Sequence, residues 1–216
     1  MDARSIIAKR VAREFTNGDV INLGIGLPTE VIKYIPQGMN IILQSENGII
    51  NMGPPPALDR VNPRIVNAGG KPTSVMPGGA FFDSAMSFAM IRGGHIAVTV
   101  LGAFQVDQDG SLANWKIPGK LSGMGGAMDL VTGAKKVIVA MEHCAKDGSP
   151  KILRKCNLPL TAKSRVNLIV TEKGVIEKRP EGLVLKELAP GISLREVMES
   201  TEAELIICDS LVEKSL

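Results

Sequence analysis

Several kinds of residue and segment are scarce in this 216-residue chain, and each scarcity excludes a class of protein. Aromatic residues make up only 3%, which argues against the base-stacking surfaces of single-strand nucleic-acid binders. The net charge is only +3, and 25 basic residues are interspersed with 22 acidic ones, so no basic stripe indicates binding to nucleic acid or to a membrane. No apolar run is long enough to span a bilayer, and the N-terminus lacks the apolar core of a signal peptide. The sequence predicts a cytoplasmic protein.

Cysteine and histidine are also rare. The three cysteines are odd in number and widely spaced, which favours reduced thiols over disulfides or a zinc site. His95 and His143 have no further ligand at metal-binding spacing, so no metal site is expected. No serine lies in a Gly-x-Ser-x-Gly motif, and a hydrolytic triad is therefore not favoured either.

The composition that remains is that of a packed globular protein. Hydrophobic residues make up 44% of the chain and charged residues 22%. We expect one domain over residues 1–216. Apolar periodicity and turn residues predict helices at 3–16, 29–36, 84–92 and 193–199, and strands at 20–23, 40–45, 64–67, 96–106, 136–141, 166–171 and 183–187. Strands that alternate with helices predict an α/β fold, a single-domain open α/β/α sandwich with a mainly parallel or mixed sheet.

Two long stretches have no clear periodicity. Residues 48–79 are rich in proline and glycine, and residues 107–126 are rich in glycine. Loops of this length in a compact domain are usually functional or disordered. Because apolar residues are scattered through both, we expect ordered loops that build a site.

One carboxylate has an unusual position. Glu46 follows the apolar run 41–43 and stands directly before the turn dipeptide Asn47-Gly48. Glutamate is depleted in strands and is rarely buried unpaired. It could simply cap backbone amides at the end of the strand. It could also be a nucleophile, because a partly desolvated carboxylate attacks an activated acyl carbon when nearby donors stabilise the resulting oxyanion.

Glycine-rich segments could supply such donors. Gly24 and Gly26 lie between a strand and a helix, where they allow close approach of a ligand but lack the third glycine of a dinucleotide motif. Gly125 and Gly126 belong to a second segment, whose consecutive N–H groups could surround one anionic atom or could form a simple connector. No Gly-Lys-Ser/Thr follows any of these glycines, so a phosphate-binding loop of the ATPase type is excluded as a motif.

Six segments, in order along the chain, resemble motifs of the class I coenzyme A transferases, and specifically of their B (β) subunit. They are residues 22–28 (NLGIGLP), 43–48 (LQSENG), 88–95 (FAMIRGGH), 112–115 (LANW), 117–120 (IPGK) and 123–130 (GMGGAMDL). The resemblance covers nearly the whole chain and implies the CoA-transferase (NagB/RpiA-like) fold.

The resemblance implies that Glu46 is the catalytic nucleophile. In this family the carboxylate attacks an acyl-CoA to give a mixed anhydride, and the CoA thiolate then forms a covalent glutamyl-CoA thioester. CoA is therefore a substrate and covalent intermediate, and no permanently bound cofactor is implied. Gly24, Gly26, Asn47, Gly125 and Gly126 become candidates for substrate or CoA binding or for oxyanion donors.

The resemblance also implies a partner and a set of substrates. Family members work with an A subunit, in a heterodimer or α2β2 heterotetramer, so this chain alone should be inactive. Acetoacetate and short-chain acids such as acetate or butyrate are the expected substrates, because Gly70 stands where succinyl-CoA-using relatives carry lysine, although Lys71 follows directly. Succinyl-CoA:3-oxoacid or 3-oxoadipate transfer, and a CoA-binding protein without turnover, are the alternatives. Asn51 also departs from the family pattern, in which a small residue follows the two apolar ones.

Overall fold

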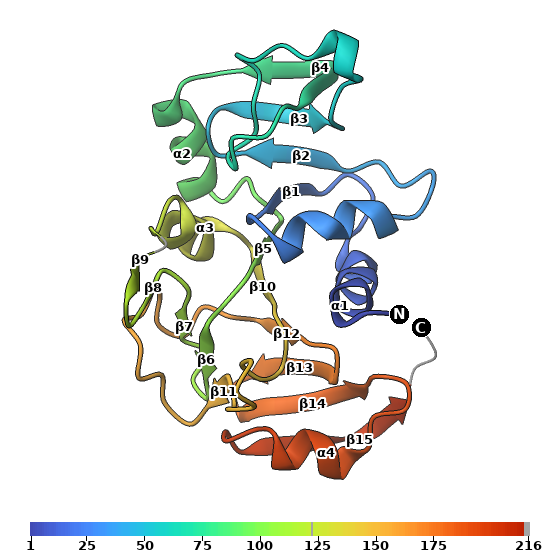
Figure 1. Ribbon diagram of the computed structural model, residues 1–216, viewed down its shortest axis with the longest axis vertical. Coiled ribbons are helices and arrows are strands. Elements are labelled where there is room, and N and C mark those ends of the chain that lie inside the picture. Colours follow the sequence, from blue (N-terminus) through green and yellow to red (C-terminus); the bar gives the residue numbers. More distant parts are fainter. Residues whose placement is uncertain (122, 214–216) are drawn as a thin grey trace.

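The computed structural model describes residues 1–121 and 123–213, so residues 122 and 214–216 of the expected domain lie outside the described part. Figure 1 shows a tall sheet that runs from β4 at the top to β15 at the bottom. The helices are α1 (Ala3–Val11), α2 (Ser84–Arg92), α3 (Ala127–Gly133) and α4 (Leu194–Glu199), with 3-10 helices η1 (Ala12–Glu14), η2 (Leu27–Tyr34) and η3 (Leu58–Arg60).

The main sheet has ten strands in the order β15-β14-β13-β12-β10-β5-β1-β2-β3-β4. Its centre, from β12 to β2, is parallel, and the antiparallel strands β3 and β4 extend one end while β13 and β14 extend the other. The sheet is therefore mixed with a parallel centre, as the sequence predicts. Its strands are β1 (Val20–Leu23), β2 (Ile42–Ser45), β3 (Ile49–Gly53), β4 (Ser74–Phe81), β5 (Val98–Leu101), β10 (Lys136–Ala140), β12 (Leu168–Val170), β13 (Gly174–Arg179), β14 (Gly182–Leu188) and β15 (Leu205–Glu213).

Two small sheets stand beside the large one. One has the order β11-β6-β7, formed by β11 (Ile152–Leu153), β6 (Gln105–Asp107) and β7 (Leu112–Ala113). The other pairs β8 (Lys116–Ile117) with β9 (Lys120–Leu121). No helix in the described part of the chain is long and apolar enough to cross a membrane.

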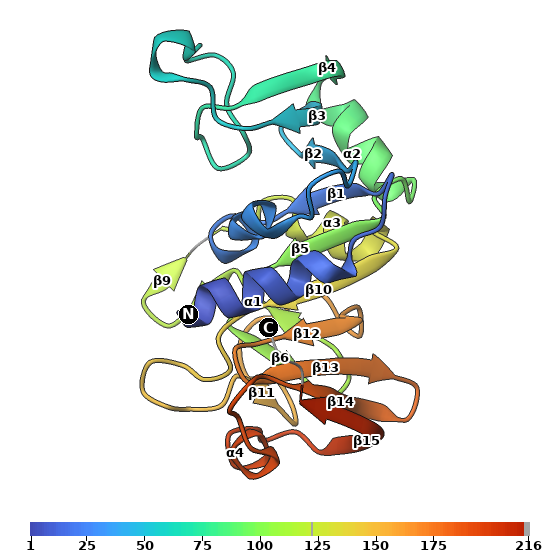
Figure 2. The same ribbon diagram turned by 90° about the vertical axis from the view of Figure 1, so that its right-hand side faces the viewer.

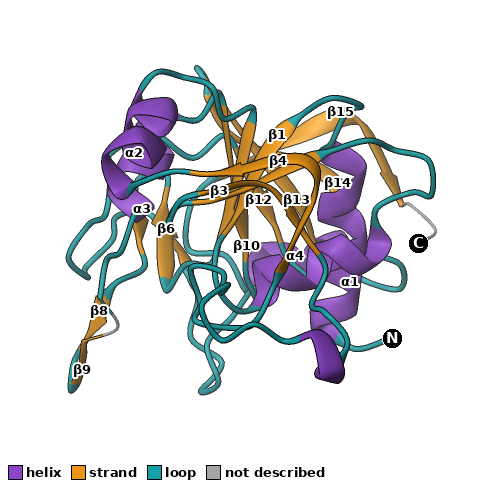
Figure 3. Ribbon diagram, turned by 90° about the horizontal axis from the view of Figure 1, so that it is seen from above, coloured by secondary structure: helices purple, strands orange, loops and turns teal. Residues whose placement is uncertain are grey.

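Helices cover both faces of the central strands, which makes three layers. Along β10, Val137 and Val139 face one core while Ile138 and Ala140 face the other. The first core includes residues of α2 and α3, and the second is built on α1. Figure 2 shows α1 lying across its face, and Figure 3 shows α2 and α3 on the opposite side. The alternation buries both sides of each central strand, which explains why these strands are mostly apolar.

Several local predictions from the sequence were wrong. Residues 29–36 form no α-helix. The chain instead forms the 3-10 helix η2, which begins at Leu27 with Pro28 in its first turn and is preceded by Gly26 at a φ of 95°. Residues 64–67 form no strand, and only the isolated bridge between Val66 and Pro72 occurs there. The stretches 48–79 and 107–126 are not simply loops, because they contain β3, most of β4, β7, β8 and β9.

Asn51 lies in a β-bulge directly behind the Glu46 turn. Its φ is 57°, and the register of β3 with β4 shifts between Ile50 and Met52. Its side-chain nitrogen donates to the Pro77 carbonyl at 3.1 Å. Asparagine tolerates the left-handed conformation better than most residues, and this explains why an asparagine can stand where the family pattern has a small residue.

Candidate active site

Glu46 stands in the tight turn that joins β2 to the antiparallel strand β3, and its side chain is half-buried. Gly48 closes the turn with a φ of 114° and donates its N–H to the Ser45 carbonyl at 3.0 Å. A Cβ atom on Gly48 would lie 2.0 Å from the Phe82 carbonyl oxygen, so no other residue fits there. The turn therefore holds Glu46 at the carboxyl end of a central parallel strand, where open α/β sheets place their ligands.

A buried amide contacts one oxygen of this carboxylate. The Asn22 side-chain nitrogen lies 3.4 Å from Glu46 Oε2, 2.7 Å from Gln44 Oε1 and 3.2 Å from the Gln44 main-chain carbonyl oxygen. Asn22 and Gln44 are register partners on the parallel strands β1 and β2. Gln44 in turn donates to the Ser87 hydroxyl on α2 at 2.9 Å. Three buried polar residues on three elements thus form one chain of hydrogen bonds that ends at Glu46.

The second glycine segment contacts the other oxygen. A Cβ atom on Gly126 would lie 3.3 Å from Glu46 Oε1 and 3.2 Å from the Phe88 ring, and one on Gly125 would lie 3.9 Å from Glu46 Oε1. The segment is anchored where α3 begins, because Asp129 accepts from Arg92 of α2 at 2.7 Å. The structure therefore brings Gly125 and Gly126 against Glu46, although the two segments are about 80 residues apart in the sequence.

Asn47 faces a neighbouring loop. Its side-chain nitrogen donates to the Val66 carbonyl at 2.8 Å, and its oxygen accepts from the Ser45 hydroxyl at 2.7 Å. The Ser45 hydroxyl also accepts from the backbone N–H of Ala68 at 3.0 Å. These bonds hold residues 66–68 beside the Glu46 turn. A role of Asn47 in substrate binding stays a prediction, because its side chain already has partners in this loop.

The first glycine segment lies at the same edge of the sheet. Gly24 follows β1 and donates to the Val100 carbonyl at 2.8 Å, so that a Cβ atom there would lie 3.1 Å from Leu101. Gly26 is exposed and precedes η2. Ile25 between them lies against Gly69, one residue beyond the loop that Ser45 and Asn47 hold. Gly24 and Gly26 are thus in position to border the site, and their role as its wall stays a prediction.

Sequence reasoning missed Asn22, Gln44 and Ser87. Asn22 and Gln44 are the amide residues within two mainly apolar strands, and each is 2% exposed or less. Buried amides are almost always hydrogen-bonded. An amide in an apolar strand two residues before a candidate nucleophile, as Gln44 is before Glu46, therefore indicates a polar contact near that nucleophile. Ser87 carries no such signal, because only the packing of α2 places it against Gln44.

Large apolar side chains are exposed on the elements that border the site. Four large side chains are exposed there by 47 to 69%: Ile25, Phe81, Met86 and Met128. An open groove of about 570 Å³ is lined by Phe82, Asp83, Ala85, Met86 and Ala89 of α2 and the segment before it. Met86 is exposed because the face of α2 that carries it points away from the sheet. Asp83 caps α2 by accepting from the Met86 N–H at 2.8 Å.

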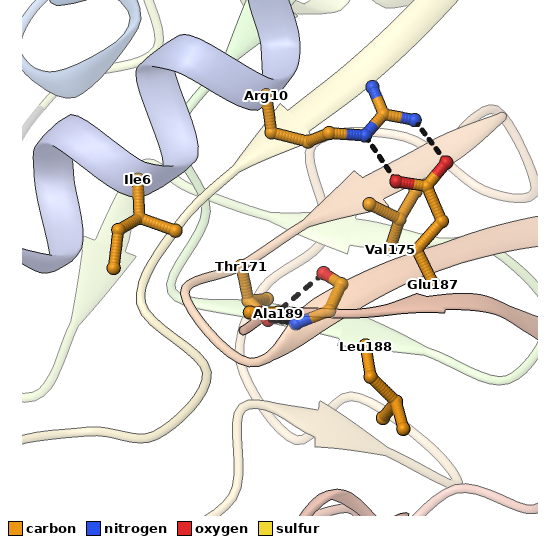
Figure 4. Close-up of a pocket in the computed structure, with 8 residues that line it drawn as sticks. Ile6, Arg10, Thr171, Val175, Glu187, Leu188 and Ala189 are labelled. Carbon is orange, nitrogen blue, oxygen red and sulfur yellow. Dashed lines mark hydrogen bonds and ion pairs between the residues drawn. The ribbon is translucent and has the colours of Figure 1, made fainter. Parts of the chain in front are cut away.

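A separate cavity between α1 and β14 is too small to bind a substrate. It is about 10 Å³, roughly the space of one water molecule, and it lies beside the ion pair of Arg10 and Glu187 (Figure 4). Thr171 and Ala189 also line it. The cavity belongs to the packing of α1 on the sheet and not to the candidate site.

His143 links its own segment to those of Thr171 and Thr201. It is fully buried, and its ring nitrogens lie 2.9 Å from the hydroxyls of Thr171 and Thr201. Burial lowers its pKa from 6.5 to about 4, with a further contribution from the positive charges of Lys173 and Lys151. Among the described residues, no three metal-binding side chains cluster anywhere, and Cys144 and Cys156 form no disulfide.

The buried imidazole should make the fold sensitive to acid. An unfolded chain takes up the proton of His143 near pH 6.5, whereas the folded chain resists it until about pH 4. The free energy of unfolding should therefore fall by up to about 3 kcal/mol from this group as the pH drops through that window. Urea unfolding between pH 7 and pH 4 measures it. His143→Gln should lose this part of the pH dependence, whereas His95→Gln, at an exposed turn, should keep it.

The comparisons with known proteins agree on one family. The model of the family described as Coenzyme A transferase matches residues 4–200. The beta subunit of the acetate CoA-transferase of Escherichia coli K12 is 56% identical over 212 residues, which are 98% of this chain and 97% of that protein. The B subunit of the succinyl-CoA:3-ketoacid coenzyme A transferase of Helicobacter pylori 26695 is 52% identical over 202 residues, 93% of this chain and 97% of the relative.

Solved structures share the fold. The acyl-CoA transferase YdiF of Escherichia coli O157:H7 matches with a TM-score of 0.79 at 24% identity, over 98% of this chain, and this chain spans only 43% of that protein. Glutaconate coenzyme A-transferase of Acidaminococcus fermentans matches with a TM-score of 0.72 at 18% identity, over 100% of this chain and 89% of that one. With a family model over most of its length and relatives above 50% identity, the chain belongs to the coenzyme A transferase family.

Proposed function

We propose that this chain is the B subunit of a CoA-transferase that moves CoA between acetoacetate and a short-chain acid such as acetate or butyrate, with Glu46 as the nucleophile. The observation that carries the proposal is the setting of Glu46. A half-buried carboxylate stands at the carboxyl end of a parallel strand, with an amide donor at one oxygen and a glycine segment at the other. No other carboxylate among the described residues has this combination of neighbours.

The chemistry follows from the carboxylate. Glu46 adds to the thioester carbonyl, and the CoA thiolate leaves as a mixed anhydride forms. The thiolate then attacks the glutamyl carbon of the anhydride and releases the first acid, so that CoA remains bound to Glu46 as a thioester. An acceptor carboxylate reverses these steps and leaves as the new acyl-CoA. Every step passes through an oxyanion, for which the N–H groups of Gly125 and Gly126 are candidate donors.

The substrate proposal rests on the relatives. Two relatives named as the beta subunit of acetate CoA-transferase, from Escherichia coli and Haemophilus influenzae, are 56% and 53% identical over nearly full length. Succinyl-CoA:3-ketoacid transferase, whose B subunit in Helicobacter pylori is 52% identical, is the second candidate. Gly70 lies in the turn that follows the loop held by Asn47, with a φ of 73°. A glycine there offers no cation to a second substrate carboxylate, and this supports a monocarboxylate acceptor.

We also propose an A subunit as the partner, in a heterodimer or α2β2 heterotetramer. Relatives of similar length carry the name of a beta or B subunit. A rat mitochondrial relative that is 54% identical is much longer, and the match with this chain covers only 41% of it. The apolar side chains of Ile25, Phe81, Met86 and Met128 beside Glu46 are the surface that such a partner would cover. Part of the acyl pocket would then come from the partner.

Mass spectrometry of the assembled enzyme tests the nucleophile. The chain is mixed with its A subunit and acetoacetyl-CoA, and the peptide that contains Glu46 is examined for the mass of CoA. We expect the adduct on that peptide and none without the A subunit. Absence of an adduct, together with activity that survives Glu46→Ala, would contradict the proposal.

Steady-state kinetics test the substrate class. With acetoacetyl-CoA as donor, acetate and butyrate should be used with a higher kcat/KM than succinate. An equal or higher value for succinate would favour the succinyl-CoA:3-oxoacid alternative and leave the nucleophile proposal intact.

A further inference from the structure

We infer that Asn22 is a further catalytic residue, which orients the Glu46 carboxylate and donates a hydrogen bond to Oε2 while the glutamyl thioester forms. Gln44 and Ser87 act through it as positioning residues. The inference rests on Glu46 being the nucleophile, as proposed above. Its basis is the chain of buried hydrogen bonds that runs from α2 through two parallel strands to one oxygen of Glu46.

The direction of these hydrogen bonds is fixed by chemistry. An ionised carboxylate only accepts, so the Asn22 atom that faces Glu46 Oε2 must be the nitrogen. The Gln44 atom beside that nitrogen must then be its oxygen, and the Gln44 nitrogen is left to donate to Ser87. All three side chains are 2% exposed or less, so water does not compete for these contacts. The amide of Asn22 is therefore preorganised as a donor before any substrate binds.

The two oxygens of Glu46 consequently have different surroundings. Oε2 faces the amide of Asn22 at 3.4 Å, whereas Oε1 faces Gly126. A distance of 3.4 Å is long for a hydrogen bond, and bonds of this kind commonly shorten once charge develops on the acceptor. Oε1 is thus the oxygen that attacks the acyl carbon, and Oε2 is the oxygen that remains as the glutamyl carbonyl.

This assignment places Asn22 at the step in which CoA becomes attached to the enzyme. The CoA thiolate adds to Cδ of the anhydride, and the electron pair of the Cδ=Oε2 bond moves onto Oε2. The pair then returns, the Cδ–Oε1 bond breaks, and the first acid leaves as a carboxylate that carries Oε1 with it. Asn22 donates to Oε2 while the negative charge stands there, which lowers the barrier of this step.

Asn22→Ala in the assembled enzyme with its A subunit tests the role. Loss of one such donor typically lowers kcat by about 10²- to 10³-fold. KM for acetoacetyl-CoA and for acetate should change little, because Asn22 contacts Glu46 and not the substrate. The rate at which the CoA adduct appears on Glu46 in a single turnover should fall with kcat. A kcat within about threefold of wild type would overturn the inference.

Asn22→Asp keeps the size of the side chain, removes its ability to donate and adds a negative charge. Gln44 can turn its amide and donate to the new carboxylate, so Asn22→Asp should keep the fold. This variant therefore tests the role even if Asn22→Ala proves unstable. A second negative charge beside Glu46 disfavours its ionisation, and the acidic limb of the kcat profile should move to higher pH. A wild-type profile with wild-type kcat would contradict the inference.

Thr99→Val is the matched control. Thr99 is the register partner of Asn22 on β5, is fully buried, and its hydroxyl has no hydrogen-bond partner within the described part of the chain. Removing that hydroxyl should leave kcat and folding unchanged. A large loss of kcat in Thr99→Val would mean that any disturbance of these paired strands impairs the enzyme. That result would overturn the interpretation of Asn22→Ala. If the wild type forms the adduct while both Asn22 variants keep wild-type kinetics, the proposed function stands and only the role of Asn22 fails.

Discussion

Glu46→Asp is expected to lower kcat of the assembled enzyme by about 10²-fold or more, although the carboxylate is kept. The substitution draws the oxygens back by one methylene group, away from both the Asn22 amide and the glycine segment. A nucleophile misplaced by about 1 Å misses the near-attack geometry. Glu46→Ala, which removes the nucleophile itself, should cost about 10⁴-fold or more.

Turnover by the Glu46→Asp variant is measured with acetoacetyl-CoA and acetate, together with its CoA adduct. Glu204→Asp is the matched control, because its side chain is 74% exposed and lies at the other end of the sheet. We expect this control to keep wild-type kcat. Wild-type kcat in Glu46→Asp would show that the carboxylate does not need the position that the turn gives it, and a nucleophile elsewhere would have to be sought.

The turn that presents Glu46 could be predicted from the sequence, and the reason is local. Asn47-Gly48 requires a tight turn after an apolar strand, and nothing in the tertiary structure competes with that requirement. Helix α2 was predicted with its observed bounds, because Asp83 caps it and Gly93-Gly94 ends it. The alternating layers could also be predicted, since the central strands are apolar on both faces.

The edges of the sheet could not be predicted in the same way. Strand β4 contains Pro77, Gly78 and Gly79, residue types that are depleted in strands and are tolerated at an edge. Strand β3 is interrupted by the bulge at Asn51. In both cases pairing with a neighbouring strand overrides the local preference, and the sequence alone does not specify that neighbour.

The composition of the site depends even more on tertiary structure. The family resemblance pointed to Glu46, Gly125 and Gly126, but nothing in the sequence joins Ser87 to Gln44 or Asn22. That chain of hydrogen bonds exists only because α2 packs over the end of β2. The residues that support a nucleophile are thus less visible in a sequence than the nucleophile itself.

Arg10→Leu is expected to lower the free energy of unfolding by about 3 to 5 kcal/mol. Arg10 of α1 donates to both carboxylate oxygens of Glu187 on β14, at 2.6 and 2.8 Å, and to Glu14 at 2.6 Å. Arg10 and Glu187 are 8% and 5% exposed. Burial lowers the pKa of Arg10, but the hydrogen bonds to Glu187 and Glu14 outweigh burial and raise it overall. The guanidinium therefore stays charged, and its loss leaves a buried carboxylate without this partner.

Urea unfolding of the variants separates the charge from the packing. Arg10→Leu with Glu187→Leu removes both charges and should recover most of the lost stability, because replacing a whole buried ion pair by apolar residues is often neutral. Arg195→Leu is the matched control, since that arginine is 86% exposed and pairs with Glu199 at the surface. We expect a change below about 1 kcal/mol there. A small effect of Arg10→Leu would mean that water enters the neighbouring cavity and solvates Glu187, and α1 would then be held to the sheet by its apolar face alone.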